Sequence, residues 1–428
     1  MLNRAENDLL CRIEGDAPMG QMLRHFWVPA ALTEELHEPE GEPLRLSIFG
    51  EDLVAWRNAD GSVGLMQNAC PHRGASMFFG RNEESGLRCV YHGWKFDVTG
   101  ACVDMPNEPA ESNFKHKIRA TAYPTQEQGG IVWAYMGPAD LQPKLPQMEW
   151  MMVPDANRII SKCNQSSNWV QAVEGGIDSS HISFLHSSLQ VDPTRFGGSN
   201  PTAIYTATDK HPRFETVDTD YGLMIAARRN AEADSYYWRV TQCLLPWYTM
   251  IPGSTEVGES IGGHAWVPID DEHTWRWSFN WRTSRPYDDD ERERMKHNGT
   301  IHAEKLPGTY MPLRTLENDF LVDREEQRTK TFSGIFGIGE QDTACQETMG
   351  PIYDRTREHL GSADTAIISY RRMLLRLVHD YQAGNPPAPA ANAEAFRVRS
   401  TSVVLPRENP WVESIQDRIK ANSEYMRV

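Results

Sequence analysis

Short apolar runs separated by turn residues in the first third of the chain predict antiparallel strands. Residues 43–50, 53–58 and 62–70 are short runs rich in apolar residues, which is typical of strands. Between them lie Glu-Asp at residues 51–52 and Ala-Asp-Gly at residues 59–61, which are typical of tight hairpin turns. We therefore expect this part of the chain to form an all-β domain.

A further hairpin is predicted around Gly129-Gly130, joining residues 120–124 to residues 131–137. The Pro-bearing residues 137–150 are typical of a connection between domains. We expect residues 1–150 to form an N-terminal arm and the all-β domain, and residues 151–428 to form a second domain.

The second domain combines helical and strand patterns. A helix is predicted from about Trp169 to His186, and residues 236–252 are rich in strand-forming side chains. Residues 259–268 and 273–283 flank a turn and predict an antiparallel hairpin. This combination predicts an α+β domain.

The C-terminal part of the chain is predicted to be helical. Apolar residues from Ile367 to Tyr381 follow helical spacing. Residues 385–395 are rich in Pro and Ala and predict an exposed linker. We expect a C-terminal helical arm beyond this linker.

Composition and charge narrow the possible functions. A chain of 428 residues is too long for one ordinary core, which favours two domains. Its formal net charge is -16, and no block of Lys or Arg is long enough to suggest a nucleic-acid or membrane surface, so neither is an expected partner. The first twenty residues contain no apolar run, and the seven cysteines are widely spread. These features predict a cytoplasmic protein with reduced thiols.

Two short motifs predict a metal site. Cys70 and His72 occur in CPHRGA, and Cys89 and His92 occur in CVYHGWKFD. Two thiolates and two imidazoles suit either a tetrahedral zinc ion or a 2Fe-2S cluster. Zinc sites usually pair Cys with Cys, whereas each motif here offers one ligand of each kind. The spacing therefore favours a Rieske cluster, with the cysteines on one iron and the histidines on the other, and leaves structural zinc as the alternative.

The residues beside these ligands resemble the cluster loops of Rieske oxygenases and their ferredoxins. Rieske proteins of respiratory complexes have an additional disulfide between the two loops, whereas Ala75 and Tyr91 stand at the corresponding positions here. Trp94 stands where those proteins have a hydroxyl residue. Because hydrogen bonds to the cluster sulfurs raise the reduction potential, this departure implies a lower one.

A second candidate metal site lies in GGIDSSHISFLH. It contains Asp178, His181 and His186, but the chain has fourteen histidines, so two histidines packed in a core are the ordinary alternative. On an ideal helix both imidazoles would reach one ion only if the helix were distorted or ended there. Asp178 could orient the imidazole of His181 by accepting its second N–H. The Rieske motif upstream favours the metal site.

With both motifs the chain resembles the catalytic subunits of Rieske non-haem iron aromatic-ring oxygenases, especially the phthalate dioxygenase-like branch. The resemblance covers nearly the whole chain, including ENDLLCRIEGDAPMG, the two cluster loops, GGIDSSHISFLHSS and TMGPIYDRTREHLGSAD. It implies an all-β Rieske domain followed by an α+β catalytic domain with a helix-grip-like antiparallel sheet and C-terminal helices. It also implies one 2Fe-2S cluster and one Fe(II) per subunit.

The resemblance implies the ligands of the ferrous iron. His181 and His186 would bind it, and a site of two histidines and one carboxylate needs one more acid. The segment GIGEQDTACQETMGP resembles the one that supplies this acid in the family, which implies Asp342. Asp319 and Glu347 are the alternatives.

The resemblance also implies partners. GIFGIGEQD lacks the third glycine of a nucleotide-binding fingerprint, so a separate NAD(P)H-dependent flavin and iron–sulfur reductase is expected, with or without a ferredoxin. A homotrimer or a dimer of trimers is expected, in which Asp178 acts as a catalytic residue between His181 of one chain and His92 of the next.

The family's substrates are the last implication. Phthalate-like relatives hold aromatic carboxylates, which require a cation in a dry pocket, preferably a bidentate arginine. Arg239 stands where the resemblance places such a residue, with Ser179 as a hydroxyl donor. Residues 204–205 are Ile-Tyr where phthalate-specific relatives offer a second arginine, which favours a larger or mono-carboxylated aromatic acid. Cis-dihydroxylation and O-demethylation both remain open, and the rival function is an electron-transfer or ligand-binding protein without oxygenase activity.

Overall fold

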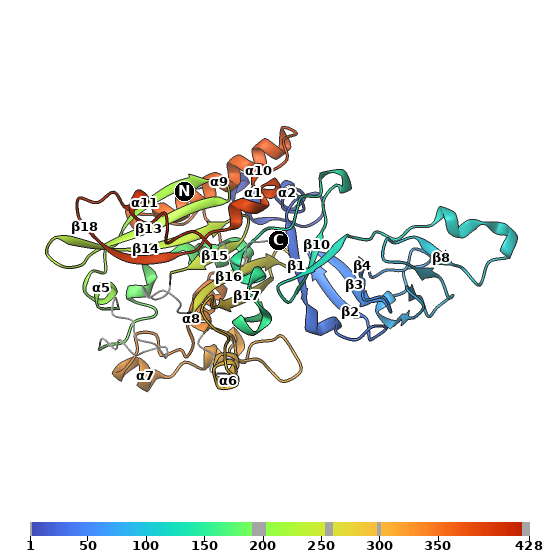
Figure 1. Cartoon of the computed structure of the whole chain (residues 1–428), viewed down its shortest axis with the longest axis horizontal. Helices are drawn as coiled ribbons and strands as arrows, with labels where there is room; N and C mark the ends of the chain where they lie inside the picture. The colour runs from blue at the N-terminus through green and yellow to red at the C-terminus, as the bar shows by residue number, and fades with distance from the viewer. Residues whose placement is uncertain (1, 191–202, 253–259, 298–300, 422–428) are drawn as a thin grey trace. The chain divides into compact units, whose positions relative to one another are not determined.

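The computed structural model describes residues 2–190, 203–252, 260–297 and 301–421. The chain folds as two compact units, and Figure 1 labels the elements of both. One unit is Ile13–Pro143, and the other combines Met1–Arg12 with Lys144–Val428. The sequence places the boundary near residue 150 and the N-terminal arm with the first domain. In the structure the arm packs on the second unit, where Arg4 forms an ion pair with Asp354.

The Ile13–Pro143 unit is an all-β domain, as the sequence predicts, apart from helix α2 (Pro18–Leu23) and short 3₁₀ turns. It contains three antiparallel sheets, ordered β1-β10-β9, β2-β3-β4 and β5-β6-β7-β8. The strands are β1 (Trp27–Leu32), β2 (Leu44–Ile48), β3 (Glu51–Arg57), β4 (Val63–Gln67), β5 (Arg81–Asn82), β6 (Leu87–Arg88), β7 (Lys95–Phe96), β8 (Cys102–Asp104), β9 (Thr125–Gln128) and β10 (Ile131–Tyr135).

The hairpin at Gly129-Gly130 forms, but one of its strands differs from the prediction. Gln128 pairs with Ile131, so strand β9 is Thr125–Gln128 and not residues 120–124. The physical reason is the turn, because a two-residue loop requires both paired strands to begin directly beside it.

The second unit contains one large antiparallel sheet, which confirms the predicted α+β fold. The strand order is β11-β17-β16-β15-β14-β13-β12, and β18 pairs with β14 outside this path. The strands are β11 (Arg158–Gln165), β12 (Arg213–Thr219), β13 (Gly222–Asn230), β14 (Ser235–Leu244), β15 (Tyr248–Ile251), β16 (Ile261–Pro268), β17 (Thr274–Trp281) and β18 (Thr401–Pro406).

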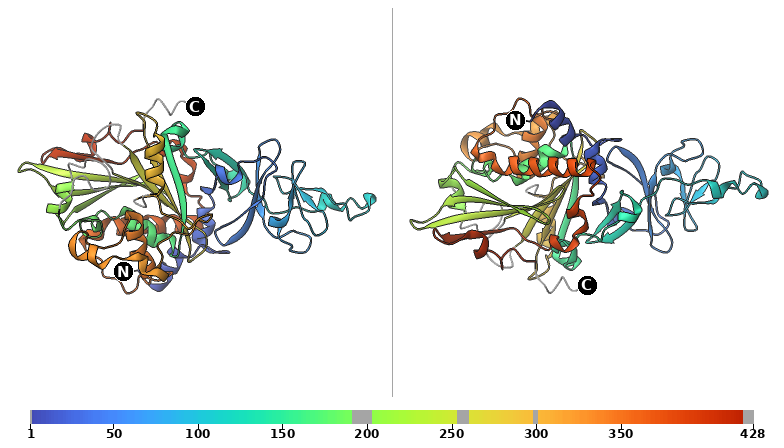
Figure 2. Two further views of the ribbon diagram at one scale, coloured as in Figure 1. Left: turned by 90° about the horizontal axis from the view of Figure 1, so that it is seen from below. Right: turned by 90° about the horizontal axis from the view of Figure 1, so that it is seen from above.

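Helices lie on both faces of this sheet. The described α-helices of the unit are α1 (Arg4–Cys11), α3 (Glu149–Met152), α4 (Trp169–Ile177), α5 (Ala203–Thr208), α6 (Asp289–His297), α7 (Arg324–Thr329), α8 (Ile338–Thr348), α9 (Thr365–Gln382), α10 (Ala388–Ala391) and α11 (Trp411–Ser414). Helix α9 contains the predicted helical run, and Ser369 on it hydrogen-bonds to Thr216 on β12. Figure 2 shows α9, in orange-red, along one face of the sheet. In the part of the chain that the structure describes, no helix is both long and apolar enough to cross a membrane.

Strand β14 sends alternate side chains to the two faces of the sheet, as the period of a strand requires. Trp238 and Val240 enter an apolar cluster that also contains Trp411 and Ile415. Tyr237, Arg239 and Thr241 therefore point to the opposite face, on which helix α9 lies. This alternation places a charged residue of the strand on the side of the candidate site.

The predicted helix from Trp169 to His186 is wrong in its second half. Helix α4 ends at Ile177, and only a short 3₁₀ turn, His181–Ser183, follows it. The helix lies very close to its neighbours, since a Cβ on Gly176 would fall 2.2 Å from the ring of Trp266. The paired glycines at 175–176 thus allow tight packing and weaken the helix where it ends.

The C-terminal arm is only partly helical, whereas the sequence predicts a helical arm beyond the linker. After α10 the chain forms β18, whose Ser402 pairs with Arg239 and whose Thr401 pairs with Val240. The arm then covers the apolar cluster with Trp411 and Ile415. The sequence signal for β18 is short, and a strand of this length becomes stable only when a neighbouring strand is present.

Candidate metal centres

The two cysteine–histidine loops of the Ile13–Pro143 unit have the same backbone structure. The amide of Gly74 donates to the carbonyl of Cys70 at 2.8 Å, and the amide of Gly93 donates to the carbonyl of Cys89 at 3.0 Å. Gly74 and Gly93 have φ angles of 75° and 79°, in the left-handed region that favours glycine. Each glycine therefore folds its loop back so that the cysteine and the histidine of one loop face those of the other.

The four predicted cluster ligands lie together. The imidazole rings of His72 and His92 are 4.5 Å apart between centroids, and the thiols of Cys70 and Cys89 are buried neighbours. Burial and the adjacent Cys89 raise the pKa of Cys70 to about 11. The Nδ1 atom of His72 is buried and has no hydrogen-bond partner among the described residues. Two buried thiols beside a partnerless imidazole nitrogen fit a 2Fe-2S cluster, whose binding would draw the protons from the thiols.

Trp94 fixes the orientation of one of these histidines. Its indole stacks on His72 with a centroid distance of 4.3 Å and an interplanar angle of 13°. The indole N–H donates to Asn107 Oδ1 at 2.7 Å, so the tryptophan is itself held in place. Sequence reasoning missed Asn107, which lies outside both motifs and reaches the loop only in the folded chain.

The second site forms where helix α4 ends. Asp178 follows the last helical residue, and its Oδ1 accepts the backbone N–H of Ser180 at 2.6 Å. This turn breaks the helical path, so His181 and His186 are not held at the angle that an ideal helix would give them. Their Nε2 atoms come within 3.1 Å of each other. The end of the helix is thus what allows both imidazoles to reach one ion.

Asp342 on helix α8 completes a group of three metal-binding side chains. Its Oδ1 lies 3.3 Å from Nε2 of His186 and 3.5 Å from Nε2 of His181. The ligand atoms of these three residues all lie within 4.8 Å of one another. Two imidazoles and one carboxylate on one side of an ion are the donor set of non-haem ferrous sites. The structure brings together the three residues that the resemblance implies.

The two alternative acids do not join this group. Asp319 is exposed to solvent, and Glu347 uses its Oε1 to accept the backbone N–H of Ser166 at 2.8 Å. Helix α8 instead points Asp342 at the histidines because Arg276 on β17 holds its first turn. Arg276 donates to the carbonyl of Gly339 at 2.6 Å and pairs with the buried Glu340 at 2.9 Å.

The charges of the group favour a bound cation. Burial alone would raise the pKa of Asp342, but the adjacent His186 and His181 outweigh it and hold the pKa below its ordinary value. Burial likewise opposes protonation of His181, but its hydrogen bond to Asp178 and the charge of Asp342 raise its pKa. The carboxylate is therefore ionised at neutral pH, and a metal ion would compete with protons for His181.

Each ligand histidine has its own outer partner. His181 Nδ1 donates to Asp178 Oδ2 at 3.2 Å, as the sequence predicts. His186 Nδ1 donates to Oε1 of Gln341 at 2.6 Å, and the amide of Gln341 is in turn fixed by donation to the carbonyl of Ile335 at 2.7 Å. Such partners set the tautomer and direction of a metal-binding imidazole. Gln341 was missed, and its only sequence signal is that it directly precedes Asp342.

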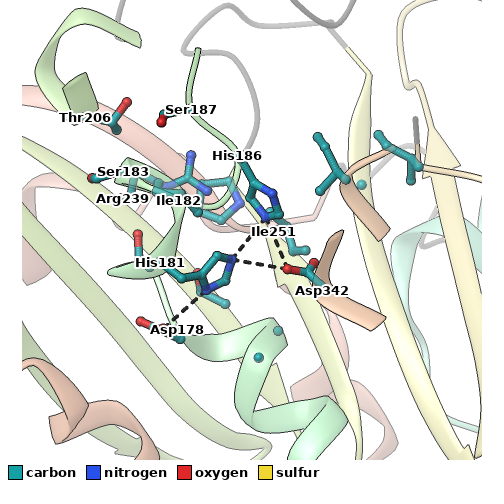
Figure 3. Close-up of a pocket in the computed structure, with 18 of the residues that line it drawn as sticks. Asp178, His181, Ile182, Ser183, His186, Ser187, Thr206, Arg239, Ile251 and Asp342 are labelled. Carbon is teal, nitrogen blue, oxygen red and sulfur yellow. Dashed lines mark hydrogen bonds and ion pairs between the residues drawn. The ribbon is translucent and has the colours of Figure 1, made fainter. Parts of the chain in front are cut away.

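The three metal-binding side chains open into a cavity of about 350 Å³, shown in Figure 3. Arg239 and Ser179, the predicted substrate-binding residues, also line it. Nε of Arg239 and Oγ of Ser179 are buried and lack a hydrogen-bond partner among the described residues. Apolar side chains make up much of the wall, including Ile182, Ile251, Trp266 and Ile338.

His264 adds a neutral polar group to the same cavity. Burial and the charge of Arg276 lower the pKa of His264 to about 4, so its imidazole is uncharged at neutral pH. Its Nδ1 lies 3.1 Å from the hydroxyl of Ser278 on the neighbouring strand. Sequence reasoning did not single out this residue, since it belongs to an ordinary strand pattern and no motif contains it.

Comparisons with known proteins identify the family of the chain. Residues 26–123 match the family model of the Rieske [2Fe-2S] domain, and residues 134–426 match a model described as LigXa C-terminal domain like. The chain is 43% identical to the phthalate 4,5-dioxygenase oxygenase subunit of Pseudomonas putida, over 96% of this chain and 94% of that protein. It is 38% identical to the 3-chlorobenzoate-3,4-dioxygenase oxygenase subunit of Comamonas testosteroni, over 97% and 98%.

The fold has counterparts among solved structures. Dicamba monooxygenase bound to 3,6-dichlorosalicylic acid superimposes with a TM-score of 0.60 at 18% sequence identity. The match covers 85% of this chain and 99% of that one. At this identity the likeness concerns the fold, and it agrees with an all-β domain followed by an α+β domain.

Replacing Gln341 by leucine should weaken iron binding. His186 would lose the acceptor that orients it, so we expect the affinity for ferrous iron to fall about 10- to 100-fold. Competition with a chelator measures this affinity, and the visible spectrum of the Rieske unit should not change. Gln341→Glu keeps an acceptor oxygen and should retain most of the affinity. An unchanged affinity in Gln341→Leu would show that the glutamine does not orient the ligand.

Proposed function

The chain belongs to the phthalate dioxygenase-like branch of the Rieske oxygenase family, and we propose that it is an oxygenase subunit that hydroxylates an aromatic carboxylate. Its 43% and 38% identical relatives are oxygenase subunits and match almost its whole length. The rival function, an electron-transfer or ligand-binding protein without catalysis, gains no support from these relatives. The group formed by His181, His186 and Asp342 favours an enzyme as well.

One observation carries the choice of substrate class. Arg239 and the three candidate iron ligands line the same cavity, and no described carboxylate pairs with this arginine. A second buried arginine, Arg229, donates to the carbonyl of Ser179 and leaves its Nη1 without a partner among the described residues. Burial and the charge of Arg239 lower the pKa of Arg229 to about 10. Two neighbouring guanidinium groups without a carboxylate favour an anionic ligand.

The cavity favours one carboxylate over two. Among its described lining residues, Arg239 is the only Arg or Lys. Ile204 is exposed, and the hydroxyl of Tyr205 donates to Glu232, so neither supplies a cation. A volume of about 350 Å³ is within the usual range for small-molecule sites. We therefore infer a mono-carboxylated aromatic acid, held by Arg239 with its ring among the apolar side chains.

The chain's own residues give the site three tasks. His181, His186 and Asp342 would hold the iron on one side and leave its other positions free for substrate and oxygen. Ile182, Ile251 and other apolar side chains keep water from the ring. When bound, the 2Fe-2S cluster supplies electrons and the ferrous iron activates oxygen. Arg239 directs one edge of the substrate away from the iron and the opposite edge toward it.

We infer that electrons cross between subunits of a trimer or a dimer of trimers. Asp178, His181 and Asp342 also line a second cavity, of about 650 Å³, on whose border Phe332 and Met349 are exposed. In the Rieske unit Val90 and Tyr91, beside His92, are exposed as well. Exposed apolar residues around both sites are consistent with a head-to-tail contact between copies, which closes naturally into a ring. Asp178 would then join His181 to the adjacent subunit's cluster.

The proposed activity can be tested with chemically reduced protein. We expect oxygen uptake that depends on an aromatic acid, and a hydroxylated product by mass spectrometry. A panel of benzoates, phenoxybenzoates, methoxybenzoates and phthalate identifies the substrate, and the product mass distinguishes a cis-diol from an O-demethylated acid. The His181→Ala protein, which keeps its Rieske cluster, is the control. Absence of substrate-dependent oxygen uptake across the panel would argue for the non-catalytic rival.

Arg239→Met should weaken binding of the acid by about 2 to 4 kcal/mol, because the carboxylate would be buried without its partner. Binding of the neutral amide of the same acid should change little. Arg228→Met is the matched control, since Arg228 is paired with Trp238 on the other face of the sheet. Isothermal titration measures the binding of the acid and of the amide to the unaltered protein and to both variants. Equal losses of binding free energy for the acid and the amide would show that Arg239 does not bind the carboxylate.

Asp178→Asn keeps the size of the side chain but loses its charge, so the link through His181 weakens. Both metals should remain bound, whereas electron delivery to the iron should slow by about a hundredfold, the upper range for residues that orient metal ligands. Single-turnover reoxidation of the cluster, with substrate and oxygen present, measures this rate. Asp364→Asn, at the second cavity, is the control. A wild-type rate, or an active monomer by light scattering, contradicts the bridging role.

A further inference from the structure

A basic segment stands out on the Ile13–Pro143 unit. Residues 113–119, NFKHKIR, contain Lys115, Lys117 and Arg119 and no acid, although the whole chain has a net charge of -16. Lys117 and Arg119 are exposed, and Lys115 is half-buried. Positive charge concentrated on a strongly acidic protein is a feature that attracts an acidic partner.

The cations of this segment are not used in ion pairs with the described residues of the chain. Lys115 Nζ donates to the carbonyl of Val103 at 3.1 Å, and Arg119 donates to the carbonyl of Thr99 at 2.7 Å. Across the described residues, no carboxylate pairs with either of them or with Lys117.

Neighbouring cations of the same unit behave differently. Arg88 is paired with Glu83 and Asp104, and Lys95 is paired with Glu84. The charges at 115–119 therefore remain available to a second molecule.

A line of aromatic rings joins this segment to a cluster ligand. Phe114 is 38% exposed, and its ring lies 6.1 Å from the ring of Trp94, edge to face. Trp94 is buried and stacks on His72 at 4.3 Å. A protein bound at Phe114 would thus be separated from the ligand His72 by one indole ring.

The other cluster histidine has a different neighbour. Tyr91 is 56% exposed, and its ring lies 3.9 Å from that of His92. The two histidines therefore have separate aromatic contacts, Tyr91 for His92 and Trp94 with Phe114 for His72. Since the contact between subunits is proposed for the side of His92, the side of Phe114 is left for another partner.

We propose that residues 113–119 are the docking site of an acidic electron-donor protein, whose redox centre approaches the chain at Phe114. The proposal rests on the proposed function, because an oxygenase subunit requires such a donor. The donor would supply one electron to the cluster that Cys70, Cys89, His72 and His92 would hold, and no bond forms or breaks. Lys115, Lys117 and Arg119 hold the acidic surface of the donor, and Phe114 fills the centre of the contact.

The test uses the holoprotein, with cluster and iron bound, and an acidic plant-type 2Fe-2S ferredoxin as the donor. The variant Lys115→Glu/Lys117→Glu reverses two charges of the segment. We expect its dissociation constant for oxidised ferredoxin, measured by isothermal titration at low salt, to rise at least tenfold. Stopped-flow reduction of the cluster by reduced ferredoxin should slow by a similar factor. In the unaltered protein, added salt should weaken the binding of ferredoxin and slow the reduction of the cluster, because it screens the charges.

The control variant is Lys144→Glu/Arg213→Glu, which makes the same change in net charge at two positions of the other unit. It should bind ferredoxin like the unaltered protein. Phe114→Ala should slow reduction by ferredoxin but not reduction by dithionite, a small molecule that needs no docking. Equal effects in both double variants would overturn the proposal, and so would a failure of the unaltered protein to bind ferredoxin.

Light scattering distinguishes a donor site from a contact between copies of the chain. Dissociation of the Lys115→Glu/Lys117→Glu assembly would mean that the segment contacts a second copy, which also overturns the proposal. Single-turnover product formation in dithionite-reduced protein needs no donor. Absence of product in the unaltered protein would refute the proposed function. The ferredoxin-binding measurements test the docking site independently of that result.

Discussion

The meeting of one buried carboxylate with two imidazoles is the interaction on which the catalytic unit depends. Asp342 comes from helix α8, and His181 and His186 come from the chain that follows helix α4, so the site exists only while both helices keep their places. Buried ion pairs hold them: Glu174 on α4 binds Arg355 and Arg371, and Glu340 on α8 binds Arg276. Loss of one partner would leave an uncompensated buried charge, a cost of about 3 to 5 kcal/mol.

The two histidines of the candidate iron site are supported differently, and the difference matches their positions. His181 is bonded to the carboxylate of Asp178, and both residues line the two cavities. His186 is bonded to the neutral amide of Gln341 and, of these two cavities, lines the one that contains Arg239. A charged acceptor raises the basicity of an imidazole more than a neutral one does. The ligand with the charged partner is therefore the one that faces the proposed contact between subunits.

The two histidines of the Ile13–Pro143 unit also differ in their surroundings. Its two loops share the same glycine turn and offer one cysteine each, yet their histidines lie in different surroundings. His72 is stacked under Trp94, whereas the ring of His92 lies beside the exposed Tyr91. A cluster with two unlike sides can receive electrons from one partner and pass them to another. That arrangement suits a subunit that transfers electrons between a donor protein and an iron in the same assembly.

Local sequence was enough to predict the ligand types, several strands and the division into an all-β and an α+β part, because these depend on residues close together in the chain. The motifs around Cys70 and Cys89 and the apolar runs between turn residues are local signals. Contacts between distant segments decided the rest: the pairing of β18 with β14 and the position of Gln341 behind His186. Only the family resemblance singled out Asp342 among the acids, and it meets the two histidines through a contact of the same kind. The end of helix α4 at Ile177 belongs here too, since packing of Gly176 against Trp266 accompanies it. These features depend on contacts between buried groups that are far apart in the sequence, and a local sequence pattern contains no information about such contacts.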